Sequence, residues 1–324
     1  MRDYKAIPVD LEFGPKDKRD YTIQMYGVNP DSIQMDEFIT PWETPVLDQG
    51  QTSMCLDFTW RAIEEEQHIR KHGYYRAIAN GYMYGQKVLT QSEGMLEMFM
   101  VSKYQKQGLP YADSFNVVGS YAECKAYFDE HITDEIREEA LQNRNSTYMT
   151  CENPKEVIAA MSAFLSSGYI GITVHNNFYD IGTDGIAPSV GQGGKAGGHA
   201  MKLSGVVKIN GKQHYFVQNS WGKDWGQDGY CFIPCDADYI NVIRVFADAI
   251  PEFEKIEMSI GDNVVKTLKG DVIMDVEPVI INQRTLVPVR FISEIFGFKV
   301  EWYGGQGTKK KGLIKIYKEE PKTS

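Results

Sequence analysis

The spacing of apolar residues in this chain changes at Gly168. Before that point apolar residues recur at the three- and four-residue intervals of amphipathic helices, and after it they alternate or run continuously as in strands. The pattern predicts an α+β fold, with a mostly helical half and a later β-rich half, and a cleft between two such halves is a common place for an active site. The predicted helices cover residues 55–72, the segment "EGMLEMFMVSKYQKQG", and residues 121–130, 134–143 and 154–167; the predicted strands are "YIGITVH", "HAMKLSGVVKI", "KQHYFVQN" and "GYCFIP".

The first predicted helix begins at a cysteine, Cys55, and ends before Gly73. Its apolar stripe would face the core, and the glutamates at 64–66 are expected to face water. The stripe consists of Phe58, Ala62, Ile63 and Ile69.

Two predicted strands form a hairpin around Asn210-Gly211, a strong signal for a two-residue turn. His199 begins the first strand and Asn219 ends the second, so both lie at the same end of the ribbon. With a strict two-residue turn Asn219 would face Lys202, three positions from His199 and on the opposite face. A direct contact between His199 and Asn219 therefore requires a β-bulge or a different turn.

The chain is expected to have three parts. Residues 1–45 show no sustained periodicity and are predicted to be an extended leader packed on the domain that follows, residues 46–250. A boundary falls near "AIPEFEKI", and residues 256–318 predict a small α+β domain in which strands flank a short helix at Val289 to Phe296, ended by Gly297.

Composition excludes several classes of protein. The net charge is −10 and the pI about 5.2, which argues against a nucleic-acid partner. No stretch approaches the 18 consecutive apolar residues that a membrane-spanning helix needs. The polar N-terminus does not resemble a Sec signal peptide. The odd count of five cysteines is not a disulfide framework; two bridges are possible but not required, so the redox compartment stays open.

Four residues together suggest nucleophilic catalysis. Cys55 begins a helix, where unpaired N–H groups and the helix dipole favour a thiolate. Gln49 lies across a Gly50 turn and could donate to an oxyanion, His199 could act as the base, and Asn219 could orient it. Such chemistry needs no cofactor and no metal.

The motifs "QGQTSMC", "GGHAM" and "QNSWGKDWGQDGY", in this order, resemble those of the papain-like cysteine peptidases. The resemblance implies a two-lobed fold, with a helical lobe and a β-barrel-like lobe, and a polypeptide substrate. It implies that Cys55 is the nucleophile, His199 its partner, Asn219 the orienting residue and Gln49 an oxyanion donor, while Trp221 shields the histidine. It further implies substrate binding at "QSEGM", through Glu93 and Gly94, and at Trp221.

The chain departs from the family pattern in three ways. Thr52 stands where the family usually has a cysteine, so the disulfide of that cysteine is absent, and Leu56 replaces the usual tryptophan. Only 54 residues precede Cys55, fewer than in the family's inhibitory propeptide. We hypothesise that the short leader can still cover the cleft.

The segment "PVIINQRTLVPVRFISEIFGFKVEW" resembles the small copper-amine-oxidase N-terminal-like domain of bacterial surface proteins. It contains no His and no Cys, so no copper is expected. The resemblance implies a stalk or a module that docks on a cell-surface or virion partner through residues 256–318. It also implies a bacterial or bacteriophage origin and an extracytoplasmic or virion setting, reached after cytoplasmic synthesis by a route other than Sec.

Three alternatives stay open. Cys55 could be an inert buried thiol in a catalytically inactive scaffold that serves adhesion. The same residues would also suit cleavage of peptidoglycan cross-link peptides or isopeptide bond formation. Cys231 and Cys235 with His214 invite a zinc site, although two thiols of one strand at this spacing lie about 13 Å apart.

Overall fold

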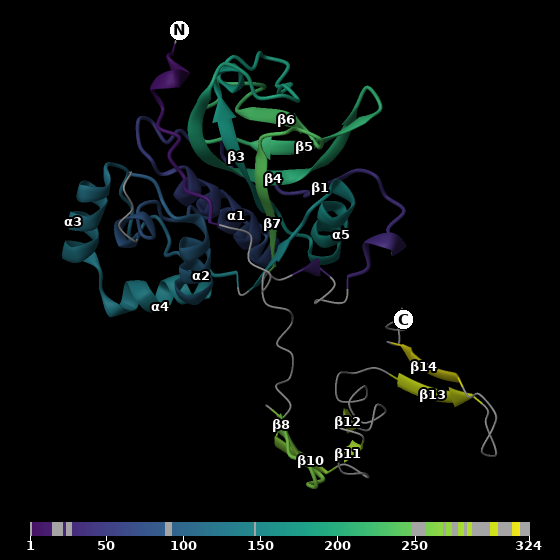
Figure 1. Cartoon of the computed structure of the whole chain (residues 1–324). Helices are drawn as coiled ribbons and strands as arrows, with labels where there is room; N and C mark the ends of the chain where they lie inside the picture. The colour runs from purple at the N-terminus through teal and green to yellow at the C-terminus, as the bar shows by residue number, and fades with distance from the viewer. Residues whose placement is uncertain are drawn as a thin grey trace. The chain divides into compact units, whose positions relative to one another are not determined.

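Helix α1 (Cys55–His72) runs through the middle of the larger of two units in the protein (Figure 1). The two units are Met1–Ile250 and Pro251–Ser324. The computed structural model describes residues 2–14, 22–23, 28–87, 93–145 and 147–247 of the first unit, and residues 257–267, 270–273, 278–281, 284–286, 299–303 and 313–317 of the second. Each unit is described by itself.

The bounds of α1 are those that the sequence predicts. Gly73 ends the helix in a left-handed conformation, φ 77°, and its N–H donates to the carbonyl of Ile69 at 2.7 Å. Glycine adopts this conformation without the penalty that a Cβ would bring, which is why it stops helices so often.

The three consecutive glutamates of α1 do not face water, so that part of the prediction is wrong. Each is at most 2% exposed, because elements from both halves of the unit pack around the helix. A buried carboxylate is tolerated where it is hydrogen-bonded or paired. Glu64 accepts from Tyr104 and Asn145, Glu65 from Arg61, Tyr75 and the N–H of Ile78, and Glu66 from Thr40, the N–H of Ser167 and the ammonium of Lys202.

A seven-stranded sheet forms the other half of the unit. Its strands follow the order β2-β7-β3-β4-β5-β6, and β1 pairs with a further part of β4, all antiparallel. The sequence predicted β3 to β6 but not the other three strands. The bounds are β1 (Phe38–Ile39), β2 (Thr147–Thr150), β3 (Gly168–His175), β4 (Lys195–Ile209), β5 (Lys212–Gln218), β6 (Tyr230–Pro234) and β7 (Ile240–Ala247).

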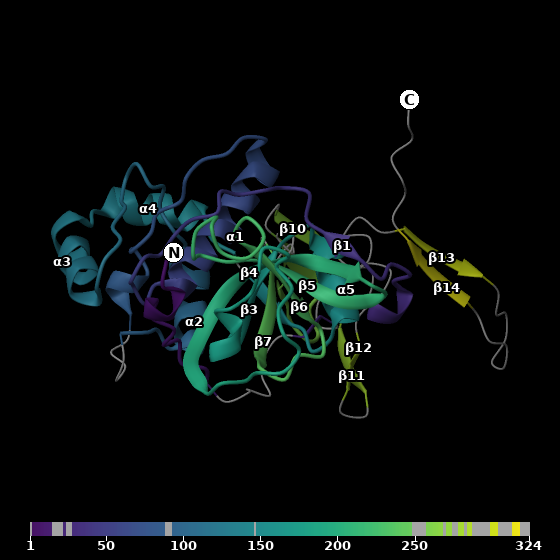
Figure 2. The ribbon, with the colours of Figure 1, turned by 90° about the horizontal axis from the view of Figure 1, so that it is seen from above.

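Four further helices cover the sheet and α1. They are α2 (Glu97–Gln107), α3 (Tyr121–His131), α4 (Asp134–Gln142) and α5 (Pro154–Phe164), close to the predicted bounds. Figures 1 and 2 both show α2, α3 and α4 on one side of the sheet and α5 on the other. Short 3₁₀ turns occur at Tyr4–Ala6 (η1), Pro30–Ser32 (η3), Tyr84–Gln86 (η4) and Asn176–Phe178 (η5).

The apolar residues of the larger unit form two buried clusters. One joins α5 to the sheet, and the other joins α1 and the helices around it to the opposite side of the sheet. Cys55 belongs to the helical cluster and Trp221 to the sheet cluster. The site therefore lies where the two clusters meet.

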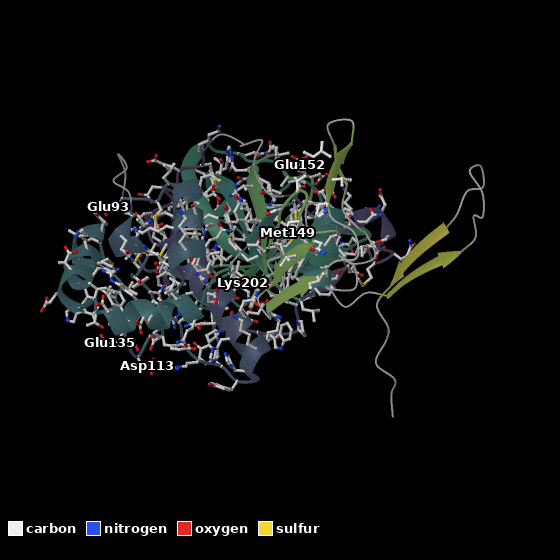
Figure 3. All side chains as sticks on the ribbon, turned by 90° about the horizontal axis from the view of Figure 1, so that it is seen from below. Glu93, Asp113, Glu135, Met149, Glu152 and Lys202 are labelled. Carbon is white, nitrogen blue, oxygen red and sulfur yellow. The ribbon has the colours of Figure 1, made fainter. Side chains whose placement is uncertain are left out.

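A buried ion pair fastens α1 to β4. The Lys202 ammonium, near the middle of the unit in Figure 3, lies 2.7 Å from the Glu66 carboxylate, and both side chains are at most 2% exposed. Lys202→Met would leave the Glu66 charge buried without its cation, so we expect the unfolding free energy to fall by about 3 kcal/mol.

Denaturant unfolding measures this change. The double variant Lys202→Met with Glu66→Gln removes both charges but keeps an acceptor for the N–H of Ser167, so it should recover most of the loss. If the single and double variants are equally stable, the pair does not act as described.

The smaller unit contains short antiparallel pairings in its described segments. These are β8 (Glu257–Met258), β9 (Val264–Thr267) and β10 (Gly270–Ile273) in one sheet, the pair β11 (Val279–Ile281) and β12 (Arg284–Leu286), and the pair β13 (Lys299–Tyr303) and β14 (Leu313–Tyr317). The predicted helix at Val289 to Phe296 lies outside the described residues. Among the helices of the described segments, none combines the length and apolar character needed to cross a bilayer.

Candidate active site

Cys55 is the first residue of α1, and backbone N–H groups surround its sulfur. The N–H groups of Cys55 and Leu56 at the start of the helix face it, and so does the N–H of Ala200, the residue after His199 on β4. These groups stabilise negative charge on sulfur. The contact with Ala200 also joins the helical part of the site to the sheet.

A β-bulge brings His199 and Asn219 together. From the turn up to Gly205 and Phe216 the hairpin keeps the register of a two-residue turn, but the register shifts by one residue between Leu203 and Gly205. Because a one-residue shift exchanges the two faces of a strand, Asn219 comes onto the same face as His199. The distance from His199 Nε2 to Asn219 Oδ1 is 2.8 Å. The sequence argument required a bulge or a different turn, and the structure has the bulge.

The hydrogen bonds of Asn219 fix the tautomer of His199. The Asn219 Oδ1 also accepts from the N–H of Ser220 at 2.8 Å, so an oxygen and not a nitrogen occupies this position. His199 Nε2 must then donate. In a neutral imidazole the other nitrogen, Nδ1, is left as an acceptor. It is buried and accepts no hydrogen bond from the described part of the chain, so it is available to take a proton from the thiol.

Trp221 covers the histidine. Its indole stacks on the imidazole with ring centroids 4.9 Å apart and an interplanar angle of 29°, and it is fully buried. An indole in this position keeps water from the hydrogen bond between His199 and Asn219. A hydrogen bond shielded in this way is stronger than one in water.

Three hydrogen bonds hold Gln49 in place. Its backbone N–H donates to Ser220, its Oε1 accepts from the Ser220 hydroxyl at 2.6 Å, and its Nε2 donates to the carbonyl of Thr52 at 2.7 Å. An amide nitrogen carries two N–H donors. One of them is therefore left to face an oxyanion.

The two predicted substrate-binding residues of "QSEGM" lie in different surroundings. The Glu93 carboxylate accepts a hydrogen bond from the N–H of Tyr121, the first residue of α3, and so turns toward that helix. Figure 3 labels Glu93 at the helical end of the unit. Gly94 is buried against the leader, because a Cβ on it would lie 1.8 Å from the carbonyl oxygen of Asp10. Of the two, only the glycine packs directly against the backbone of the leader.

The N-terminal segment lies across the site as an extended chain. The N–H of Leu11 donates to Gly198 at 3.0 Å, and Glu12 exchanges hydrogen bonds with Met95 and Glu97, each at 3.0 Å. The leader thus bridges the sheet and the helical half, and Figure 1 shows it in purple between the two.

Glycines make this close approach possible. A Cβ at Gly197 would lie 1.6 Å from the carbonyl oxygen of Val9, and one at Gly198 would lie 2.0 Å from that of Leu11. A side chain at either position would exclude the leader. The glycines before His199 therefore give a second backbone room to pass.

The leader buries the site and changes its electrostatics. Cys55 is 1% exposed and His199 is fully buried. Burial raises the pKa of the Cys55 thiol to about 12, with a smaller contribution from the nearby Asp10 carboxylate. Burial also lowers the pKa of His199 to about 4, against the effect of its bond to Asn219. With the leader in place, thiol and imidazole are thus a neutral pair at neutral pH.

The sequence of the leader contains a short alternating pattern that predicts an extended segment. The pattern is easily missed because residues 1–45 as a whole show no sustained periodicity. Ile7, Val9 and Leu11 are all buried, and the residues that alternate with them are exposed or partly exposed. Such alternation is typical of a strand with one covered face. Asp10, which accepts a hydrogen bond from Ser53 at 3.0 Å, lies on the other side of the same segment and was not predicted as part of the site.

The remaining cysteines take no part in the site. All five are free thiols, and four of them, Cys55 included, are buried. Among the residues that the structure describes, no group of three or more His, Cys, Asp or Glu side chains could hold a metal ion.

Comparisons with known proteins agree with this geometry. The family model described as "Papain family cysteine protease" matches residues 42–244. Cathepsin K of Mus musculus is 24% identical over 228 residues, which cover 66% of this chain and 62% of the relative. Cysteine proteinase 3 of Dictyostelium discoideum is 23% identical over 197 residues, which cover 60% of this chain and 56% of the relative. The chain therefore spans about six-tenths of the length of these relatives.

Two solved structures have the same fold. Xylellain, a cysteine protease from Xylella fastidiosa, superposes with a TM-score of 0.60 at 16% identity, covering 77% of this chain and 99% of that one. Procathepsin L2 from the larval midgut of Tenebrio molitor gives a TM-score of 0.55 at 19% identity, covering 75% and 79%. The predicted papain-like α+β fold is confirmed.

The C-terminal part has its own match. The family model described as "Copper amine oxidase N-terminal domain" matches residues 251–310, which confirms the predicted resemblance. These residues contain neither histidine nor cysteine, so they do not fit a copper site. The larger unit decides the family, because its match covers more than half of the chain. This chain belongs to the papain family of cysteine peptidases, a family of hydrolases.

Proposed function

We propose that the protein is an endopeptidase that hydrolyses polypeptides through an acyl-enzyme on Cys55. One observation carries the proposal. The bulge in β4 and the bond to Asn219 hold His199 in the tautomer that can accept a proton at Nδ1, and the next residue, Ala200, directs its N–H at the sulfur of a cysteine at a helix N-terminus. A buried structural thiol would need none of these arrangements.

The chemistry follows from the positions of these groups. His199 Nδ1 takes the thiol proton, and the sulfur of Cys55 attacks the peptide carbonyl. The resulting oxyanion accepts from Gln49 Nε2 and from the N–H of Cys55. The imidazolium then protonates the leaving amine, the C–N bond breaks, and the acyl group remains on sulfur. Water, deprotonated by the same imidazole, attacks the thioester and releases the acid.

The path of the leader supports an endopeptidase over an enzyme that acts on chain ends. The leader contacts Trp221 through Tyr4, with ring centroids 6.4 Å apart, and continues past the thiol to pair with Leu96 through Glu12. The leader thus extends along the site in both directions, from Trp221 to Leu96. A polypeptide could enter the site without a free terminus.

The same contacts support control by the leader. A chain that fills the cleft in this way excludes substrate, so the larger unit would act only after residues 7–13 move away. Residues 256–318 would then be a docking module on a cell surface or virion. The match to the copper amine oxidase N-terminal domain and the likeness to a bacterial cysteine protease support a bacterial or bacteriophage origin and an extracytoplasmic setting.

A catalytically inactive scaffold is the second candidate, and the burial of the thiol favours it. A peptidyl electrophile such as a peptidyl chloromethyl ketone separates the two, because it needs both a peptide-binding cleft and a nucleophile. In the full chain with Leu11→Asp, a substitution expected to displace the leader because Leu11 is buried in the helical cluster, intact mass and peptide mapping should show one adduct, on Cys55, that is lost when His199→Ala is added. The other four free cysteines are internal controls. Slow labelling of all five at similar rates would instead support the scaffold.

A further inference from the structure

The side chain of Arg2, in the leader, occupies a charged site next to the proposed catalytic residues. The guanidinium of Arg2 forms a two-pronged contact with the Asp48 carboxylate: Nη2 donates to Oδ1 at 2.8 Å and Nη1 contacts Oδ2. Nη1 also donates to the carbonyl of Trp221 at 3.3 Å, and the cation lies 5.6 Å from the centre of the Tyr4 ring.

The backbone holds Asp48 in place for this contact. Asp48 pairs with Trp221 in an isolated antiparallel bridge, and its Oδ1 accepts from the N–H of Gly50 at 2.8 Å. Gly222 has φ 82°, and a Cβ on it would lie 3.3 Å from Asp48 Oδ2 and 3.5 Å from Arg2 Nη1. The glycine leaves the space that carboxylate and guanidinium share. A fork of N–H donors on a carboxylate is the geometry that selects arginine over lysine.

The reaction fixes which end of the cleft this is. Asp48 directly precedes Gln49, and the Asp48 partner Trp221 stacks on His199. Because the imidazolium must protonate the departing amine, that amine lies on the His199 side of the carbonyl. The residues after the scissile bond then extend past the indole toward Asp48.

The surroundings of this end are acidic. Lys5 of the leader lies 3.8 Å from Asp180, and the charge of Asp224 also acts on Arg2 and Tyr4. A recess of about 660 Å³ lies between these residues and Trp225. The leader thus places two cations against carboxylates here, which is charge complementarity and not only apolar packing.

We propose that Asp48 determines specificity for a basic residue, preferably arginine, within the first two positions after the scissile bond, and that Arg2 occupies this subsite while the leader is in place. The inference rests on the proposed peptidase function. It names a substrate class: polypeptides with a basic residue on the leaving side of the cleaved bond.

The test compares peptides within one protein. A parent peptide whose cleavage position has been mapped by mass spectrometry is varied among Arg, Lys, Gln and Glu at the first two positions after the bond. The ratio of kcat/KM between two such peptides does not depend on how often the leader is open, because both compete with the same leader. In the full chain we expect arginine to exceed glutamine about tenfold, the size expected for a hydrogen-bonded charged pair.

Asp48→Asn should bring that ratio close to one, since the amide keeps the shape of the carboxylate but loses its charge. The matched control is Asp113→Asn. Asp113 also pairs with an arginine, Arg76, but Arg76 lies on the ring of Tyr111, which contacts His68, about 20 Å along α1 from Cys55. It should leave the ratio at its original value.

A second arm keeps this inference separate from the proposed function. In the full chain with Cys55→Ala and Leu11→Asp, the second substitution being expected to displace the leader, fluorescence anisotropy compares binding of the arginine and glutamine peptides with and without Asp48→Asn. A binding preference that depends on Asp48 supports the subsite even if no peptide is ever cleaved, and then only the peptidase proposal fails. Cleavage with the same ratio in both proteins overturns the subsite and leaves the peptidase intact. Equal binding and no cleavage overturn both.

Discussion

Leu11→Asp in the full chain is expected to raise the rate of Cys55 alkylation by iodoacetamide at pH 7.5 about a thousandfold. Leu11 is buried in the helical cluster of apolar residues, where an ionised carboxylate would lose its hydration. The leader should therefore leave the cleft. The thiol would return from a pKa of about 12 toward its ordinary value of 9.0, and only the thiolate reacts.

The control is Ile39→Asp. It introduces the same charge in the same N-terminal stretch, but Ile39 is 47% exposed, so the alkylation rate should stay low. Near-ultraviolet circular dichroism shows whether each variant keeps its packed core. A folded Leu11→Asp chain with unchanged alkylation would mean that the leader is not what protects the thiol.

The fraction of molecules in which the leader has left the site should rise both as the pH falls and as the pH rises from neutrality. The closed site lowers the pKa of His199 to about 4 from 6.5, so the open state binds the extra proton and gains population as pH falls through this window. The closed site raises the pKa of Cys55, so the open state also gains as pH rises above 9. Asp10, whose pKa burial raises, opposes opening in acid. Alkylation of the wild-type chain, corrected for thiolate fraction, should be slowest between about pH 6.5 and 9.

Cys55→Ala in the Leu11→Asp background is expected to lower kcat/KM for peptide hydrolysis by at least about four orders of magnitude. Without the sulfur no acyl-enzyme forms, and only the binding and oxyanion contributions are left. His199→Ala should cost a similar factor, because the thiol loses its base and the amine its acid. Asn219→Ala should cost about tenfold or more, since the imidazole stays but its tautomer and orientation are no longer held.

Cys235→Ala is the matched control for the cysteine. It removes another free thiol, which is partly exposed at the end of β6, and should leave kcat/KM unchanged. Comparing thermal unfolding of all variants separates loss of chemistry from loss of structure. Hydrolysis that persists in Cys55→Ala would exclude the acyl-enzyme route.

Local patterns predicted the helices and the central strands well. Apolar spacing and glycine stops are properties of short segments, so α1 ended at Gly73 as expected. The pairing of His199 with Asn219 was harder. The turn alone put them on opposite faces, and the need for a bulge could be deduced, but its place between Leu203 and Gly205 depends on the neighbours of β4.

The sequence patterns missed two features that depend on contacts between distant parts of the chain: the burial of Glu64–Glu66 and the position of the leader. Glu64–Glu66 look like a solvated face of a helix, yet partners from distant segments make burial acceptable, such as Lys202 for Glu66. The leader is similar. Its alternating residues are too few to predict a strand, and its place in the cleft depends on Gly197 and Gly198, nearly two hundred positions along the chain.

The closed leader also affects how fast Cys55 is oxidised. Peroxides convert a cysteine to sulfenic acid, and then irreversibly to sulfinic acid, only when the thiolate is formed and can be reached. Cys55 meets neither condition while Val9, Asp10 and Leu11 lie over it. In this state Cys55 would stay reduced in an oxidising environment. The segment that we propose blocks substrate would therefore also protect the thiol that the reaction needs.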